Sequence, residues 1–182
     1  MTTSSPAHDR HTARSASNPR PALTLAWGVN PEETDQNQVQ VTTTRELTDI
    51  LATIHAQALR RGVAQQIDIW EGLLPDPTIN GAPGDPAELD DFLPEPFLQA
   101  VIGHPERAGL RWLGRDQQVQ AIHPALPLLA EPVLYDNGGA TDPMPPELLP
   151  LTYTDVEHIL TVFLLHRTRA DDVTWTDLSE IL

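Results

Sequence analysis

Four short apolar segments follow one another closely between residues 97 and 135, and their spacing constrains the fold more than any other feature. We expect strands at 97–102, 110–113, 117–122 and 133–135, with Asn137-Gly-Gly139 closing the last of them. The turns between the first three are short and contain Gly. Because such turns cannot hold a crossover helix, they favour antiparallel hairpins over βαβ units.

Two capping boxes predict two helices. The first pairs Thr43 with Glu46, and Gly62 suits the left-handed position after that helix. The second pairs Thr154 with Glu157. Apolar residues recur at helical spacing behind each box. The two apolar faces are Leu47, Ile50, Leu51, Ile54 and Ala58, and then Val156, Ile159, Leu160, Phe163 and Leu164.

The remaining pattern completes an α+β fold. Further strands are expected at 22–27, 39–41, 67–69 and 173–175, and Pro143, Pro145, Pro146 and Pro150 are expected to form a stiff connector. Residues 1–21 show no periodicity and predict a disordered tail. We therefore expect residues 22–182 to form one α+β domain, in which a mainly antiparallel sheet carries two packed helices.

One long segment interrupts this pattern. Residues 75–96 contain six Pro in 22 positions, which excludes a helix or a central strand and predicts an exposed excursion. Residues 71–100 hold seven acids and no basic residue. The whole chain has a net charge of -15, and all 11 basic residues are Arg. Such a charge repels nucleic acid and membranes and attracts basic partners.

The sequence offers no pattern of catalytic chemistry. It has no Cys, so disulfides and thiolate zinc sites are excluded, and no pair among its seven His has metal-ligand spacing. The paired carboxylates Asp90-Asp91 and Asp171-Asp172 are sequence neighbours, whereas glycosidase-type chemistry needs two carboxylates held across a cleft. We expect no catalytic residue, no metal and no cofactor.

The absence of a membrane-length apolar run and of a signal-peptide core predicts a cytoplasmic protein.

Several segments, taken in order, resemble the immunity-protein family of bacterial polymorphic toxin systems, whose members often guard against nucleic-acid deaminase toxins. These segments cover residues 22–176, and the excursion at 75–96 looks like an insertion into a shorter family loop. They are Val41-Thr-Thr-Thr-Arg-Glu-Leu47, Ile67-Asp-Ile69, Leu98-Gln-Ala-Val-Ile-Gly103, Leu110-Arg-Trp-Leu113, Val133-Leu-Tyr135, and the Pro-containing start of the second helix followed by Val173-Thr-Trp175.

The resemblance implies a non-enzymatic inhibitor. Such a protein binds its cognate toxin domain, one molecule to one, and occludes the toxin's active site. No nucleic acid, membrane or small-molecule substrate is expected as a partner. Independently of the resemblance, an enzyme that acts on nucleic acid presents a basic groove to the phosphates, and an acidic binder matches that groove.

The acid-rich stretch 71–100, together with Trp112 and Asp116, supplies the candidate partner-binding residues. They are Glu71, Asp85, Glu88, Asp90, Asp91 and Glu95, with Trp112 and Asp116 as secondary candidates. The alternative interpretations are a solvated acidic loop and a Trp that packs in the core. At the level of function, the alternatives are an acidic secretion chaperone or adaptor for an effector, and a small hydrolytic enzyme built from scattered acids.

Overall fold

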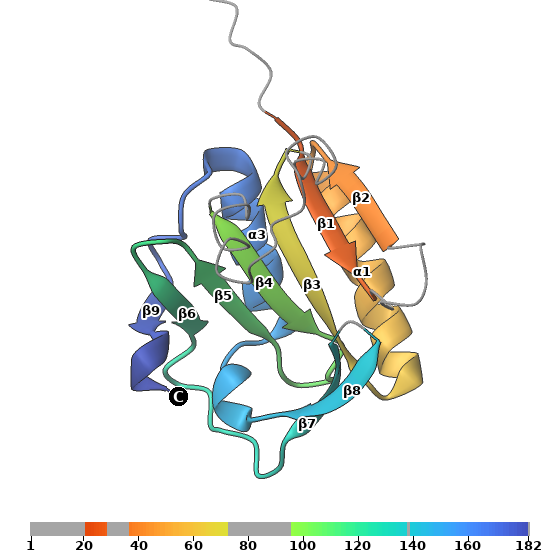
Figure 1. Ribbon diagram of the computed structural model, residues 1–182, viewed down its shortest axis with the longest axis vertical. Helices are drawn as coiled ribbons and strands as arrows, with labels where there is room; N and C mark the ends of the chain where they lie inside the picture. The colour runs from red at the N-terminus through yellow and green to blue at the C-terminus, as the bar shows by residue number, and fades with distance from the viewer. Residues whose placement is uncertain (1–20, 29–36, 73–95, 138, 182) are drawn as a thin grey trace, which may run out of the picture.

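The computed structural model describes residues 21–28, 37–72, 96–137 and 139–181, and this part of the chain forms a large sheet with two helices (Figure 1). The helices are α1 (Thr44–Arg61) and α3 (Tyr153–His166). The strands are β1 (Leu23–Trp27), β2 (Asn37–Val41), β3 (Ala64–Glu71), β4 (Phe97–Ile102), β5 (Gly109–Leu113), β6 (Gln118–Ile122), β7 (Val133–Asn137), β8 (Ala140–Met144) and β9 (Thr174–Asp177). The expected α+β class is confirmed.

The main path of the sheet is antiparallel throughout. Its strand order is β2-β1-β3-β4-β5-β6-β9, which confirms the expected β4–β5–β6 meander. The fourth predicted strand, β7, leaves this meander and pairs in parallel with the start of β3, where Ala64 faces Tyr135. The β7–β8 hairpin therefore branches from the sheet below β3 (Figure 1).

Both helices lie on one face of the sheet, behind it in Figure 1, and enclose the main core. Nine of the ten residues predicted for their apolar faces are buried, and Ile50 is partly buried. Strand residues at alternate positions, such as Leu25, Ile67 and Leu98, are fully buried against them. Burying an aliphatic or aromatic side chain of this size contributes about 1.5–3 kcal/mol, so this interface is the main source of stability.

The first capping box is confirmed and the second is wrong by two residues. Thr43 Oγ1 accepts from the Glu46 backbone N–H at 3.2 Å, and Gly62 adopts the left-handed conformation at φ 68°. The second helix begins at Tyr153, because Thr152 pairs with Asp155 and not Thr154 with Glu157. Asp155 Oδ2 accepts from the Thr152 backbone N–H at 2.8 Å. The carboxylate of Asp155 therefore has the capping role that the sequence pattern assigned to Glu157.

The proline-rich connector is partly a strand. Pro143 lies inside β8, opposite Leu134 of β7, so the expected connector starts after Met144. Since β8 pairs only with β7, it is an edge strand, and an edge strand can hold a residue without a backbone N–H. Pro146 begins the short 3-10 helix η1 (Pro146–Leu148), and a second one, η2 (Leu178–Glu180), follows β9.

The described part of the chain has no helix with the length and apolarity needed to cross a membrane.

Candidate functional site

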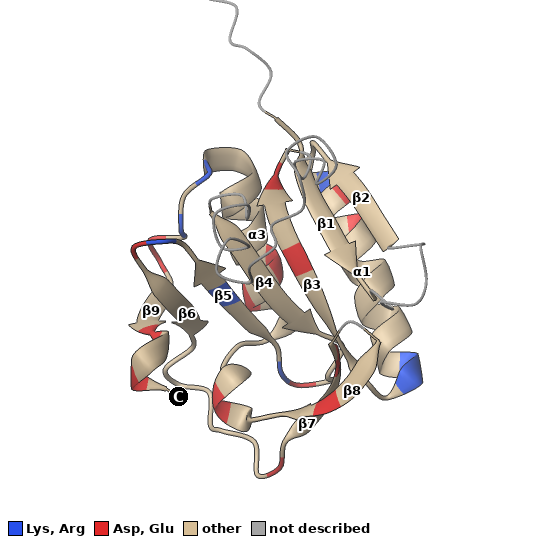
Figure 2. Ribbon diagram, in the orientation of Figure 1, with Lys and Arg blue, Asp and Glu red and all other residues tan. Residues whose placement is uncertain are grey.

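The face of the sheet without helices carries a row of polar side chains that crosses four strands. The register places Asp68 of β3 opposite Gln99 of β4, Gln99 opposite Arg111 of β5, and Arg111 opposite Gln120 of β6. Their strand neighbours, such as Ile67 and Leu110, belong to the core on the helix side. Because side chains alternate along a strand, the polar row lies on the opposite face, which carries no helix of the described structure and which we call the open face. Figure 2 shows the acidic position in β3 and the basic position in β5 on either side of β4.

The row is hydrogen-bonded and partly desolvated. Gln99 Nε2 donates to Asp68 Oδ1 at 3.1 Å, and Gln66 Nε2 donates to the same oxygen at 3.3 Å. Burial raises the pKa of Asp68, although both amides and Arg111 act in the opposite direction. Burial also lowers the pKa of Arg111, against the influence of Tyr135 and Asp68. Both charges are thus held where water solvates them poorly, so a partner that supplied hydrogen bonds would stabilise them.

The β6 end of the polar row is buried in the fold. Gln120 is fully buried, and its Nε2 donates to the backbone carbonyl of Glu147 in η1 at 2.7 Å. Its Oε1 is buried without a hydrogen-bond partner in the described structure. The half-buried part of the row is therefore Asp68, Gln99 and Arg111. This part offers an acceptor, an amide and a guanidinium, which suits hydrogen bonding to another molecule.

Most of the acids predicted to bind a partner lie outside the described residues: Asp85, Glu88, Asp90, Asp91 and Glu95. Glu71 is described, at the end of β3. Its Oε2 accepts from Arg167 Nε at 3.0 Å, in an ion pair whose carboxylate is 34% exposed. Arg167 also donates to the carbonyls of Pro21 and Leu164. Glu71 therefore ties β3 to the end of α3.

Trp112 faces the helices and joins the core. Its ring packs edge-on against Phe163 at 5.4 Å and Trp175 at 6.5 Å between centroids, and the Arg169 guanidinium lies 6.0 Å from its ring centroid. The same residue also lines an open recess of about 280 Å³ together with Asp116. The structure thus brings the two secondary candidates together, although the tryptophan's main contacts are structural.

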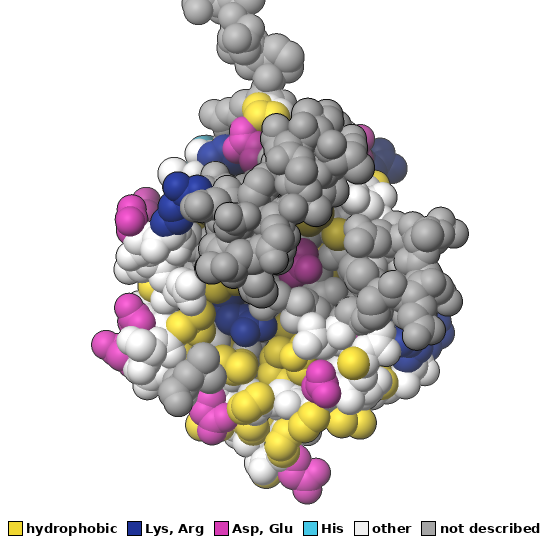
Figure 3. All heavy atoms as spheres, in the orientation of Figure 1, with side chains coloured by type: hydrophobic (Ala, Val, Ile, Leu, Met, Phe, Trp, Pro, Cys, Tyr) yellow, Lys and Arg dark blue, Asp and Glu magenta, His cyan; other side chains and the backbone are white. Residues whose placement is uncertain are grey.

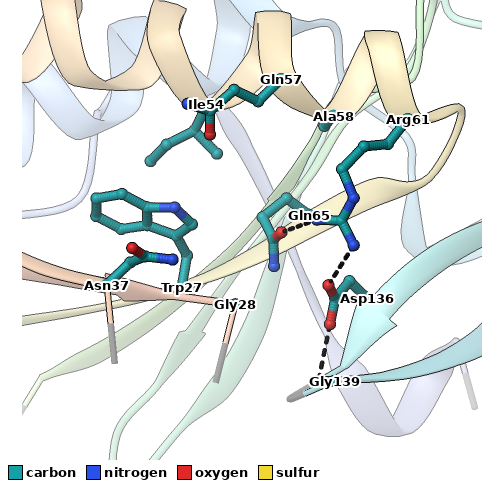
Figure 4. Close-up of a pocket in the computed structure, with 10 residues that line it drawn as sticks. All are labelled: Trp27, Gly28, Asn37, Ile54, Gln57, Ala58, Arg61, Gln65, Asp136 and Gly139. Carbon is teal, nitrogen blue, oxygen red and sulfur yellow. Dashed lines mark hydrogen bonds and ion pairs between the residues drawn. The ribbon is translucent and has the colours of Figure 1, made fainter. Parts of the chain in front are cut away.

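A second recess, of about 270 Å³, lies between α1 and the β7–β8 hairpin (Figure 4). Arg61 Nη2 donates to Asp136 Oδ2 at 3.0 Å, and the Gly139 backbone N–H donates to Asp136 Oδ1 at 2.8 Å. Arg61 also reaches Gln65 Oε1 at 3.4 Å. Since both oxygens of this buried carboxylate are already engaged, Asp136 holds the hairpin turn against α1 and is poorly placed to act as a base.

Two His–Asp pairs lie near a third recess, of about 240 Å³. His123 Nδ1 is 3.2 Å from Asp155 Oδ2, and His158 Nε2 is 3.0 Å from Asp172 Oδ2. Burial acts to raise the pKa of Asp155, but hydrogen bonds from Thr152 and then His123 outweigh it and lower the pKa. Nowhere in the described ranges do three or more His, Asp or Glu residues come together as metal ligands.

The sequence matches no protein-family model and no curated protein.

The polar row was not predicted from the sequence. Its only sequence signal is that Asp68, Gln99 and Arg111 each take a polar position inside a short apolar strand. That signal assigns each residue to one side of its own strand, whereas the alignment of the three depends on the sheet register.

Proposed function

We propose that this chain is an immunity protein that binds a cognate bacterial toxin domain, one molecule to one, and neutralises it by covering its active site. The toxin class implied by the resemblance is a nucleic-acid deaminase. The protein acts in the cytoplasm by binding alone, without a catalytic residue, metal or cofactor. Its partner is a protein, and not a nucleic acid, a membrane or a small-molecule substrate.

The observation that carries this proposal is the way charge is distributed in the fold. Several guanidinium groups are engaged internally: Arg61 with Asp136, Arg167 with Glu71, and Arg107 with the carbonyls of Glu106 and Pro127. Several exposed carboxylates, in contrast, form no ion pair in the part of the chain that the structure describes. Examples are Glu131, Asp142 and Glu147. The surface offered to a partner is thus strongly acidic, in agreement with the net charge of -15.

An acidic surface matches the target that the proposal names. A deaminase that acts on nucleic acid must hold the phosphate backbone in a basic groove beside the pocket that receives the base. Carboxylates laid over that groove replace the phosphates and exclude the substrate. Electrostatic attraction also speeds the encounter between inhibitor and toxin. The half-buried polar row on the open sheet face can add directional hydrogen bonds to such a complex.

Co-expression tests the proposal. The full chain is produced with the toxin domain encoded by the neighbouring gene, and growth and co-purification are measured. We expect growth to be restored and a 1:1 complex to be recovered. A stable complex in which the toxin stays active would instead identify an adaptor or chaperone. The absence of both rescue and complex would contradict the proposal.

A further inference from the structure

A long stretch of the chain lacks basic residues and contains the most exposed leucines of the described structure. No Arg occurs between Arg115 and Arg167, while this stretch contains seven acids. Two leucines within it are among the most exposed large hydrophobic side chains of the described residues: Leu128 is 59% exposed and Leu134 is 51% exposed. Figure 3 shows hydrophobic side chains gathered on the lower part of the open face, with acidic side chains around them.

We call the apolar residues at and before the start of β7, together with Pro143 across the hairpin, the β7 patch. It consists of Leu128, Leu129, Pro132, Leu134 and Pro143. Leu129, Pro132 and Leu134 line one open recess of about 380 Å³, and Leu134 faces Pro143 across the β7–β8 hairpin. Glu131 and His104 line the same recess. An apolar depression with polar groups at its margin can receive an apolar side chain of a partner.

The segment that carries the patch is fixed by the fold. Arg107 is buried, and its Nη2 donates to the Pro127 carbonyl at 2.7 Å. The Leu126 backbone N–H donates to the His123 carbonyl at 2.9 Å. Leu129 packs against the smaller buried cluster that includes Val133. Leu128 is therefore presented on an ordered loop, so binding a partner requires little further ordering of this segment.

The charges around the patch determine what kind of molecule fits it. Glu131 is exposed and lines the recess itself, whereas Asp142 pairs with Tyr135 on the other face of the hairpin and Glu147 lies in η1. Two copies of this surface facing each other would bring their Glu131 carboxylates together, in molecules that each carry a net charge of -15, which disfavours self-association. A surface with an apolar side chain flanked by Lys or Arg would complement both the recess and its charged margin.

We propose that the β7 patch is a docking surface for a partner protein that inserts an aliphatic or aromatic side chain next to a Lys or Arg residue. The identification of that partner as the toxin domain rests on the proposed function. The patch supplies the apolar contact, and Glu131 supplies a carboxylate at its margin. This surface lies within the described part of the chain and is separate from the acidic excursion at 75–96.

Matched variants of the full chain test the patch. Binding of the purified toxin domain is measured by titration calorimetry for the wild type and for the double variant Leu128→Ser with Leu134→Ser. The control is Leu59→Ser with Leu165→Ser, because these leucines of α1 and α3 are 41% and 45% exposed. The patch variant should bind about thirtyfold more weakly, since a partner can no longer bury two half-exposed leucines. The control should stay within about twofold.

A charge variant gives a second readout that does not depend on the leucines. Glu131→Gln should slow association at low salt, and the difference should fade at high salt. Its control is Glu180→Gln, which removes another exposed carboxylate. Thermal unfolding confirms that each variant is folded.

The outcomes separate the patch from the proposed function. Failure of the wild type to bind contradicts the proposed function, and with it the identity of the partner. Wild-type binding that neither patch variant weakens relative to its control leaves the function standing and refutes this surface. A wild-type dimer that dissociates in the leucine variant assigns the patch to a second copy of the chain, which also refutes the proposal.

Discussion

Replacing Gly103 by Ala should be among the most damaging single-methyl changes in this fold. Gly103 follows β4 at φ +104° and lies directly under the last turn of α1. A Cβ atom at this position would be 2.1 Å from Ala58 Cβ. Carbon atoms in contact are about 3.5–4.0 Å apart, so helix and strand would have to separate by about 1.5 Å.

Two terms set the size of the effect. An Ala in left-handed conformation costs about 1–2 kcal/mol, and overpacking a filled core costs about 1–3 kcal/mol. We therefore expect Gly103→Ala to lower the free energy of unfolding by about 3 kcal/mol. Gly62→Ala is the matched control, because Gly62 has φ +68° but no atom within 4 Å of the added Cβ. It should cost only the conformational term, about 1–2 kcal/mol.

A double-mutant cycle isolates the steric term. Ala58→Gly removes the atom that the new Cβ meets, and alone it costs about 1 kcal/mol of helix propensity. The double variant Ala58→Gly with Gly103→Ala should be more stable than the sum of the single effects predicts, by about 1–3 kcal/mol. Urea unfolding followed by Trp fluorescence gives all four free energies. Equal losses for Gly103→Ala and Gly62→Ala, or additive effects in the cycle, would show that the added methyl group does not clash with Ala58.

Three further predictions concern carboxylates. Asp155→Asn weakens the Thr152 cap and should cost about 1 kcal/mol at pH 7. Because the folded pKa of Asp155 is lowered, this stabilisation is present above the ordinary pKa of 3.8 and is lost as the pH falls below that value. Urea unfolding of the wild type and the variant at a series of acidic pH values measures this loss. Asp68 has a raised pKa, so the folded protein holds that proton more tightly and loses stability as pH rises from 3.8 through the folded pKa. Asp68→Asn should remove this pH dependence. Urea unfolding of both proteins across pH 4–7 checks this. A free energy of unfolding that changes with pH in the variant as it does in the wild type would contradict the prediction. Reversing the charges of Asp90 and Asp91 should strongly slow association with the toxin domain at low salt, as measured by stopped flow; an unchanged rate would remove both acids from the docking surface.

Local patterns carried the sequence-based prediction of the fold. The α1 capping box, Gly62 and the apolar faces of both helices depend on neighbours within a few residues, so the sequence reveals them directly. Pro143 misled the prediction because its tolerance depends on β8 being an edge strand. The parallel pairing of β7 with β3 joins residues far apart in the chain, and no local signal encodes it.

The candidate site was harder to predict for the same reason. Glu71 was chosen for its charge, but the fold places Arg167 beside it, and the resulting ion pair joins β3 to the end of α3. Trp112 was chosen as an aromatic anchor, yet its contacts with Phe163 and Trp175 place it in the core. Conversely, the exposure of Leu128 depends on Arg107 and the core, which hold the rest of its loop in place. Those contacts form only in the tertiary structure, so the sequence does not reveal them.

Titrating the full chain into active, purified toxin domain tests neutralisation most directly. We expect toxin activity to fall linearly as the chain is added and to reach zero at one molecule per toxin molecule. Toxin activity that remains undiminished in the presence of excess chain would contradict this expectation.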